Sequence, residues 1–259
     1  MTKNDKTKIT SRKQKKGTNS ERFTRWAIAI GAVVLLIVVP ALLYVVMKYR
    51  PNIVIDKTEY PIVGVDISKH NGDIDFKVLA ANRLSFVIAK ATEGTDYNDP
   101  LFEHNYSAAK AVGLKVGAYH FFSMKKDGRL QAENFIRSIN GKNLDLPLVI
   151  DVEEWDYNFV NDPTDAIEQL TIMTDYITQK GYKVMIYTNK NGYKKFIKQH
   201  LSHLPLWICS FQHPHRVRGY NWTILQYSHW GEVDGIKGDV DLDVFNGDSL
   251  AWERWLQAI

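Results

Sequence analysis

The chain has 259 residues, of which 45% are hydrophobic and 24% are charged, and its formal net charge is +4 at pH 7. The positive charge is concentrated at one end, because residues 1–51 contain 11 Lys or Arg against 2 Asp or Glu, whereas the remainder contains 22 against 27. The main part of the chain is therefore acidic, and no nucleic-acid partner is predicted for it. The single cysteine, Cys209, excludes an intrachain disulfide and a zinc site built from several cysteines.

The N-terminal segment predicts a disordered arm followed by a membrane span. Residues 1–25 are rich in Lys and Arg and have almost no apolar side chains to bury, so they are expected to be disordered. From Trp26 to Met47 the chain has no charged residue and consists mainly of Ala, Ile, Leu and Val. As a helix, this stretch can cross a hydrocarbon layer of about 30 Å. Residues 26–47 are therefore predicted to be a transmembrane helix, with the membrane as a partner.

The flank of this stretch distinguishes it from a cleaved signal peptide. A signal peptide has a shorter apolar core followed by small residues, whereas Lys48-Tyr-Arg-Pro51 follows directly here. The favoured interpretation is an uncleaved signal anchor whose basic N-terminus stays in the cytoplasm. The protein would then be a single-pass protein of the cell membrane, with its folded part periplasmic or extracellular. A buried core helix is the alternative, which the long apolar run and basic flank disfavour.

Residues 48–61 are predicted to be a linker, and residues 62–259 to fold as one domain of catalytic size. The predicted strands are 62–66, 85–90, 114–119, 146–151, 183–187, 206–209, 223–227 and 240–245. The predicted helices between them are 76–83, 101–112, 130–140, 163–180 and 192–200. This alternation predicts an α/β fold, an irregular (β/α)8 barrel of the TIM type with helices missing near its end. A doubly wound open sheet is the alternative.

The run Leu146-Pro-Leu-Val-Ile-Asp151-Val-Glu153 ends abruptly in carboxylates. Side chains alternate along a strand, so Asp151 and Glu153 point the same way and share one small space. Two carboxyl groups held this close cannot both ionise freely, and one is expected to hold a proton near neutral pH. A general acid beside a charge-stabilising carboxylate has this arrangement. A solvated acidic loop and half of a site for a hard metal ion are the alternatives.

Polar residues also interrupt other apolar runs at their C-terminal ends, where the active site of a parallel barrel forms. These positions are Asp66, Lys90 with Glu93, Tyr119 with His120, Tyr187, Gln226 with Tyr227, and Asp241. Together they would line a rim with acids, amides and aromatic rings. Such a rim suits a carbohydrate, because sugar rings stack on aromatic side chains and sugar hydroxyls need donors and acceptors.

Several motifs, in order along the chain, resemble those of the glycoside hydrolase family 25 lysozymes, which are N-acetylmuramidases. They are Gly64-Val-Asp66-Ile-Ser68, Lys90-Ala-Thr-Glu93-Gly94, Ala118-Tyr-His120-Phe121, Leu148-Val-Ile-Asp151-Val-Glu153, Tyr187-Thr-Asn189, Leu206-Trp207, Gln226-Tyr227-Ser228 and Gly238-Asp-Val-Asp241-Leu. The resemblance implies an irregular β/α barrel that cleaves the β-1,4 bond between N-acetylmuramic acid and N-acetylglucosamine. Peptidoglycan glycan strands are the implied partner, and no metal or organic cofactor is implied.

The resemblance also assigns roles to the acids by position. Glu153 matches the family's proton donor, and Asp151 matches the companion acid that supports it and holds the substrate's 2-acetamido group. Asp66 and Asp241 match two further acids of the site. Retention with assistance from the substrate's acetamido oxygen is the favoured mechanism, with a nucleophilic side-chain carboxylate as the alternative.

Seven rim residues are predicted to bind the glycan. They are Tyr119, Tyr187, Trp207, Gln226, Tyr227, Lys90 and Glu93. Packing in the barrel wall is the alternative for the aromatic residues, and a structural ion pair is the alternative for Lys90 with Glu93. No metal site is predicted from the histidines, because no His-x-x-x-His on a predicted helix supports one.

Two features depart from the family pattern, and two other functions are considered. Glu154 followed by Trp155 lengthens the acidic edge. Asp243 stands where the family usually has Asn, and this extra acid is expected either to alter the rim or to face outward. A non-catalytic wall-binding barrel would be expected to have lost an acid, yet all four matched acids are present. A chitinase-like hydrolase would carry further acidic residues before Asp151, where this chain has Leu148-Val-Ile150.

Overall fold

The computed structural model describes residues 19–48 and 53–259, which belong to two separate compact units. The first contains a single helix, α1 (Asn19–Lys48). Its segment Glu21–Val45 is long and apolar enough to cross a membrane, judged by length and composition. Residues 1–18 of the predicted arm lie outside the described residues.

The helix begins earlier than expected. Residues 19–25 were predicted to belong to the disordered arm, but they form the first turns of α1. Glu21 lies in the first turn, where a negative charge interacts favourably with the positive end of the helix dipole. Polar residues such as Arg22 and Arg25 can continue a helix, because its backbone hydrogen bonds are made within the helix itself.

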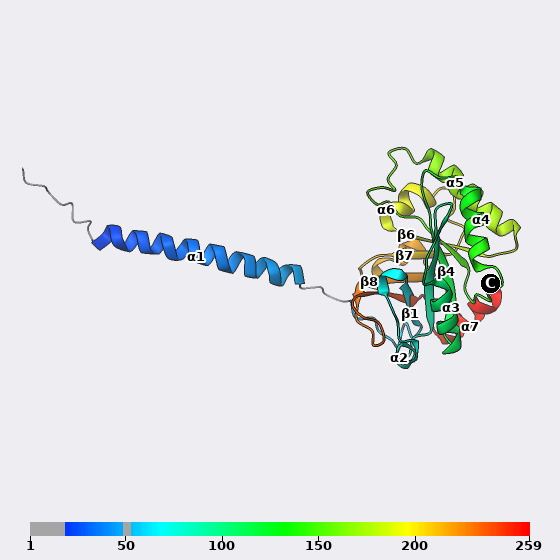
Figure 1. Ribbon diagram of the computed structural model, residues 1–259, viewed down its shortest axis with the longest axis horizontal. Coiled ribbons are helices and arrows are strands. Elements are labelled where there is room, and N and C mark those ends of the chain that lie inside the picture. Colours follow the sequence, from blue (N-terminus) through cyan, green and yellow to red (C-terminus); the bar gives the residue numbers. More distant parts are fainter. Residues whose placement is uncertain (1–18, 49–52) are drawn as a thin grey trace, which may run out of the picture. The chain divides into compact units, whose positions relative to one another are not determined.

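Within residues 53–259, eight strands close into a barrel (Figure 1). In order around the barrel they are β1 (Val63–Ile67), β2 (Phe86–Glu93), β4 (Lys115–Phe121), β5 (Leu148–Asp151), β6 (Val184–Asn189), β7 (Leu206–Cys209), β8 (Ile224–Gly231) and β9 (Val240–Phe245). The short strand β3 (Tyr97–Asn98) pairs with the end of β2. Because β1 pairs with both β2 and β9, the sheet has no open edge there, and the predicted barrel is confirmed over the open sheet.

The barrel is irregular because its last strand runs in the opposite direction. β9 is antiparallel to both of its neighbours, β8 and β1, whereas the other adjacent strands of the barrel are parallel. The described residues 232–239, which connect β8 to β9, form no helix. Antiparallel strands can be joined by a short loop, so no crossover helix is needed at this point.

Four helices follow strands around the outside of the barrel (Figure 1). They are α2 (Phe76–Ala81), α3 (Phe102–Ala111), α4 (Gly128–Ile139) and α5 (Thr164–Gln179). The connection after β6 contains α6 (Lys190–Gly192) and a π-helical turn, η2 (Tyr193–Ile197). Short 3-10 turns occur after β1 and β7, namely η1 (Lys69–Asn71), η3 (Pro214–Arg216) and η4 (Arg218–Tyr220).

A terminal helix that the sequence patterns did not predict, α7 (Ser249–Ala258), covers one end of the barrel. Its Trp252 ring stacks on Phe86, the first residue of β2, with 5.4 Å between ring centroids, and contacts Phe245, the last residue of β9. Both strand residues lie at the end opposite the carboxyl ends of the parallel strands. The barrel is therefore closed at this end by aromatic packing between α7 and the strand ends.

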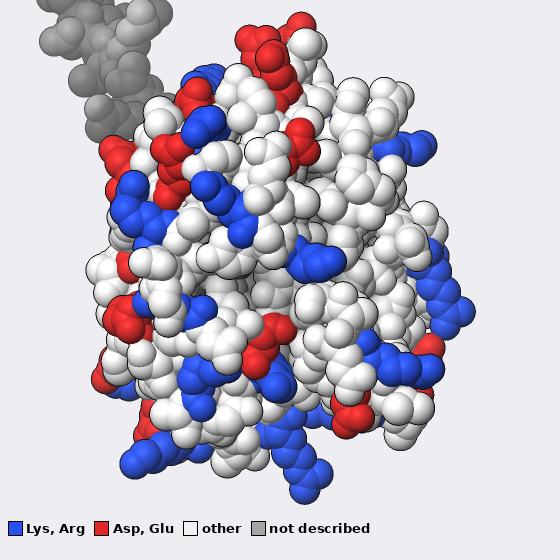
Figure 2. Space-filling view, turned by 90° about the vertical axis from the view of Figure 1, so that its right-hand side faces the viewer, with Lys and Arg blue, Asp and Glu red and all other residues white. Residues whose placement is uncertain are grey.

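Charges of both signs are interspersed on the face of the molecule shown in Figure 2. Lys and Arg side chains alternate there with Asp and Glu, without a continuous basic stripe. This face therefore lacks the concentrated positive potential that attracts a phosphate backbone.

Candidate active site

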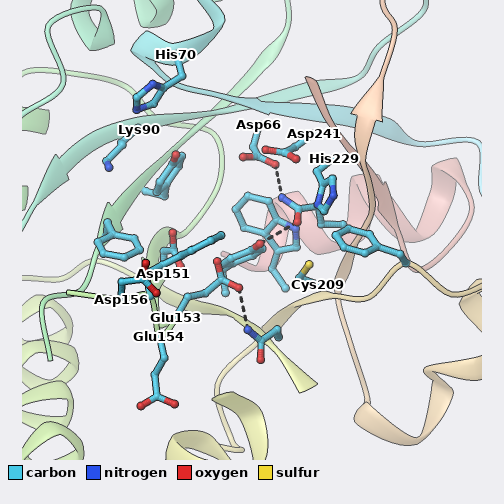
Figure 3. Close-up of a pocket in the computed structure, with 18 of the residues that line it drawn as sticks. Asp66, His70, Lys90, Asp151, Glu153, Glu154, Asp156, Cys209, His229 and Asp241 are labelled. Carbon is cyan, nitrogen blue, oxygen red and sulfur yellow. Dashed lines mark hydrogen bonds between the residues drawn. The ribbon is translucent and has the colours of Figure 1, made fainter. Parts of the chain in front are cut away.

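A pocket of about 900 Å³ lies at the carboxyl ends of the parallel strands (Figure 3). All four predicted acids line it: Asp66 from β1, Asp151 from the end of β5, Glu153 just beyond it, and Asp241 from β9. In Figure 3, Asp66 and Asp241 lie side by side, and Asp151 and Glu153 lie across the pocket from them. Residues separated by up to 175 positions in sequence thus share one hollow, as the end-of-strand pattern predicted.

The β5 pair combines a buried acid with a more accessible one. Asp151 is the last residue of the strand, and its buried Oδ1 has no hydrogen-bond partner among the described residues. Glu153 is half-buried, and Asn189 Nδ2 donates a hydrogen bond of 3.1 Å to its Oε1. Burial raises the pKa of both carboxyls, and the charge of Glu153 raises the pKa of Asp151 further. Glu153 is the more accessible acid of the two, and it lines the pocket where a ligand can reach it.

Asp66 and Asp241 face each other across the antiparallel pairing of β1 and β9. Gln226 Nε2 donates to Asp66 Oδ2 at 2.8 Å, and the Tyr187 hydroxyl donates to Gln226 Oε1 at 2.8 Å. This chain of donors fixes the Gln226 amide and, through it, the Asp66 carboxyl.

The pKa of both carboxyls is raised in this pair. For Asp66 the cause is chiefly burial, followed by the charges of Asp241 and Asp243. Burial and the charge of Glu153 raise the pKa of Asp241 to about 6. Part of the acid cluster therefore holds protons near neutral pH, while its remaining negative charge favours a positive charge that develops on a ligand.

Five of the seven predicted binding residues line the pocket: Tyr119, Tyr187, Trp207, Gln226 and Lys90. Gln226 forms hydrogen bonds with both Asp66 and Tyr187, so it holds these two side chains in place inside the pocket. The Lys90 ammonium lies 2.7 Å from Glu93 Oε2 and 5.2 Å from the centre of the Phe121 ring. Lys90 thus reaches the pocket while forming the ion pair that was the alternative for Lys90 and Glu93.

Two predicted binding residues lie outside the lining of the pocket. Tyr227 follows the inward-facing Gln226 on β8, and successive side chains of a strand alternate, so its ring packs in the outer cluster that contains Ile208 and Leu225. Its neighbours are those of a barrel-wall aromatic. Glu93 accepts hydrogen bonds from Lys90 and from the Tyr157 hydroxyl at 3.4 Å.

The position of Asp243 differs from both positions that were expected from the sequence. It neither alters the rim nor faces outward, because it shares the inward face of β9 with Asp241 and is completely buried inside the barrel. Trp207 Nε1 donates a hydrogen bond of 2.8 Å to its Oδ1. The direction of β9 explains this position, because an antiparallel strand runs from the rim toward the barrel floor.

The side chains of His120 and Glu154 do not point toward the pocket centre, as side chains of one common rim would. His120 is fully buried between Thr92 and Gln131, and burial lowers its pKa to about 3, so it is a neutral structural residue and not part of the rim. Glu154 points away from the pocket centre in Figure 3 and forms an ion pair of 2.7 Å with Lys195.

Several lining residues escaped the sequence-based prediction. Asn189, which donates to Glu153, is the polar residue at the end of β6, and this position was the available signal. Trp155 and Tyr157 follow β5, and Phe211 follows β7. Trp155 and Tyr157 remain 59% and 69% exposed, although large aromatic rings normally bury most of their surface. Their rings therefore remain accessible beside the pocket.

The pocket has no evident metal centre. Among the described residues, no group of three or more His, Cys, Asp or Glu side chains is arranged to hold a metal ion.

The sequence matches known proteins over most of the barrel. The pattern of the glycosyl hydrolases family 25 matches residues 65–236. The chain is 34% identical to the autolytic lysozyme of Clostridium acetobutylicum over 183 residues, which cover 71% of this chain and 55% of that protein. It is 31% identical to lysozyme M1 of Streptomyces globisporus, covering 73% of this chain and 69% of that protein.

The fold gives the same relationship. A family 25 glycosyl hydrolase from Bacillus anthracis superimposes with a TM-score of 0.72 at 33% identity, covering 80% of this chain and 98% of that structure. Thus the chain spans about half of the autolytic lysozyme but nearly all of the solved hydrolase. With the family pattern extending from β1 to the loop before β9 and containing Asp66, Asp151 and Glu153, this chain belongs to the glycosyl hydrolases family 25, and its barrel is a glycoside hydrolase domain.

Proposed function

We propose that the barrel is a lysozyme that hydrolyses the β-1,4 bond between N-acetylmuramic acid and N-acetylglucosamine in peptidoglycan. The observation that carries this proposal is the shared pocket of Asp66, Asp151, Glu153 and Asp241, with the accessible Glu153 as its proton carrier. The two relatives described above are themselves named lysozymes, which supports the same substrate class.

Glu153 acts as the general acid and then as the general base. Burial raises its pKa, which favours the protonated carboxyl, and this proton passes to the glycosidic oxygen as the bond to the anomeric carbon breaks. The ionised Glu153 next takes a proton from the water that attacks the anomeric carbon. Each turnover therefore consumes one water molecule and returns Glu153 to its protonated form.

Asp151 assists by holding the substrate's 2-acetamido group. Its Oδ1 is an acceptor without a partner among the described residues, and an acetamido N–H can supply the missing donor. Held in this way, the acetamido oxygen attacks the anomeric carbon from the face opposite the leaving group and forms an oxazolinium intermediate. Water then opens this intermediate from the first face, so the anomeric configuration is retained.

Asp66 and Asp241 stabilise the transition state by their charge. An oxocarbenium-like transition state develops positive charge that the neutral sugar lacks, so nearby carboxylates stabilise the transition state more than the substrate. Exposed rings at the rim, Trp155 and Tyr157, supply stacking surfaces for the sugars on either side of the cleaved bond.

The helix α1 is proposed to anchor the hydrolase in the cell membrane. The supporting observations are the apolar segment Glu21–Val45 and the net charge of +9 on residues 1–51, from 11 basic and 2 acidic residues. By the positive-inside rule, the N-terminus is cytoplasmic and the barrel lies on the periplasmic or extracellular side. Protease added to intact cells should then degrade the barrel and spare an epitope tag at the N-terminus; protection of the barrel would contradict this orientation.

Digestion of purified peptidoglycan by the full chain in detergent tests the activity. Mass spectrometry is expected to find soluble fragments that end in reducing N-acetylmuramic acid. Fragments that end in reducing N-acetylglucosamine would show a different bond specificity. The absence of soluble fragments, with the protein still sedimenting with the polymer, would instead indicate a wall-binding barrel.

A further inference from the structure

Asp243 lies directly beneath the catalytic pocket and takes no part in the mechanism above. β9 pairs Asp241 with Asp66 and pairs Asp243 with Gly64, two residues earlier on β1. Because β9 runs from the rim into the barrel, Asp243 lies one layer deeper than the pair at the rim. Its exposed fraction is 0%, and it is not part of the pocket lining.

One of the two carboxyl oxygens of Asp243 has no hydrogen-bond donor and can therefore share a proton. Trp207 Nε1 donates to Oδ1 at 2.8 Å, but no N–H or hydroxyl group among the described residues donates to the buried Oδ2. The partner that faces Asp243 is the carboxyl of Asp66, which receives its own N–H donor from Gln226 at 2.8 Å. Two buried carboxyls in contact satisfy both groups only if a proton lies between them.

We propose that Asp243 is a positioning residue that shares one proton with Asp66, so that the pair carries a single negative charge and Asp66 is held from beneath. The role of this pair in turnover rests on the proposed function, whereas the shared proton itself does not. An Asn at this position could donate an amide N–H to Asp66 but would bring no titratable group. The aspartate therefore adds a protonation equilibrium to the floor of the site.

The groups around the pair favour retention of this proton. Burial is the first cause of the raised pKa of both carboxyls, and the charge of Asp241 is the second. The other titratable groups that act on the pair or respond to its charge are Asp151 on β5, Tyr119 on β4, Tyr187 on β6, Cys209 on β7 and Tyr227 on β8. None of these groups is a cation, and the Lys90 ammonium is ion-paired with Glu93.

The shared proton makes stability depend on pH with a definite sign. In the unfolded chain both carboxyls ionise near pH 4, whereas in the folded chain their pKa is raised, so the folded state binds more protons. The stabilising contribution is complete below the unfolded pKa and is lost as the pH rises through the folded pKa. Asp243→Asn removes one of the two groups and should therefore remove much of this loss.

The test is the melting temperature of the full chain in detergent between pH 5 and pH 9. For Asp243→Asn, the difference in Tm from the wild type is expected to become more positive by on the order of 5 °C across this range. Asp145→Asn is the matched control, because Asp145 is ion-paired with Lys110 and Lys115 and its pKa is lowered. Its contribution is complete well below pH 5, so its Tm difference should stay constant.

A constant Tm difference for Asp243→Asn would overturn the shared proton. If this variant does not fold, Trp207→Phe replaces it: loss of the Nε1 donor should raise the pKa of Asp243 and enlarge the alkaline loss of Tm.

Peptidoglycan cleavage then tests the positioning role, since the activity ratio of Asp243→Asn to wild type should change with pH. A ratio that is the same at every pH would reduce Asp243 to a packing role. Failure of the wild type to cleave would reject the proposed function and leave the Tm test valid.

Discussion

The carboxyl pairs of β5 and β9 have the same spacing but opposite environments. Asp151 and Glu153 are two residues apart on a strand that runs outward, so the second acid passes the strand end and reaches the rim. Asp241 and Asp243 are also two residues apart, but β9 runs inward, so the second acid enters the barrel floor. Strand direction alone therefore places the second acid at the rim in one pair and in the barrel floor in the other.

This difference also separates what the two protons can do. Glu153 is half-buried and receives one hydrogen bond from Asn189, so its proton can pass to a ligand in the pocket. The proton proposed for the Asp66–Asp243 pair would lie below the lining, to which Asp243 does not contribute. A raised pKa thus produces chemistry only where the acid is also accessible.

The largest expected effect comes from the accessible acid. Glu153→Gln should lower the rate of reducing-end release from peptidoglycan by about 10²–10⁴-fold, the usual contribution of a general acid. The Tm at neutral pH should not fall, because the change removes a carboxyl whose pKa burial already raises. Activity equal to that of the wild type would reject Glu153 as the proton donor.

Glu154→Gln is the matched control for this variant. Glu154 is adjacent in sequence but pairs with Lys195 at 2.7 Å and points away from the pocket centre (Figure 3). The surface ion pair contributes little, so activity should stay within about threefold of the wild type. A loss as large as that of Glu153→Gln would mean that charge in this segment, and not proton transfer by one residue, sets the rate.

An intermediate loss of activity is expected for a change of Asp241, the acid of the β9 pair that lies at the rim. The pKa of Asp241 is raised to about 6 by burial and by the charge of Glu153, so its stabilising negative charge should appear as the pH rises through this value. Asp241→Asn should lower kcat/KM at pH 7 by about tenfold and flatten the acidic limb of the pH profile. An unchanged limb near pH 6 would assign that titration to another acid of the cluster.

The smallest effect concerns the donor to Glu153. Asn189→Asp keeps the oxygen that accepts hydrogen bonds from the backbone N–H groups of Asn191 and Gly192, but it replaces the amide donor with a carboxylate. The pKa of Glu153 should then rise, moving the alkaline limb of kcat/KM upward by roughly one pH unit. Turnover should fall only several-fold. A downward shift of that limb would show that Asn189 does not stabilise the ionised form of Glu153.

Much of the barrel was predictable because its signals are local. Each predicted strand is present, since a short apolar run followed by a polar residue describes a buried strand that ends at the rim of a barrel. Three of the acids that line the pocket, Asp66, Asp151 and Glu153, follow this end-of-strand pattern, whereas Asp241 lies at the start of the antiparallel β9. α7 was not predicted, although Asp248 caps it and Trp252 and Trp255 lie on one face.

The local sequence pattern did not show in which direction each side chain points. Tyr227 seemed equivalent to Tyr187, yet only Tyr187 lines the pocket, because the adjacent Gln226 holds the inward position on β8. Asn189 was quoted within a motif, but its role became visible only when β6 placed it 3.1 Å from Glu153. The exposed Trp155 and Tyr157 lie in a loop whose position has no periodicity to read.

The sequence by itself determined the acidic barrel unit, the apolar N-terminal span, the strands and the identity of the four clustered acids, because composition and periodicity are properties of neighbouring residues. Only the tertiary structure decided the reversed direction of β9, and with it the burial of Asp243 against Trp207 and Asp66. The spacing of two residues fixes which side chains share a face, but strand direction decides whether that face leads to solvent or into the core.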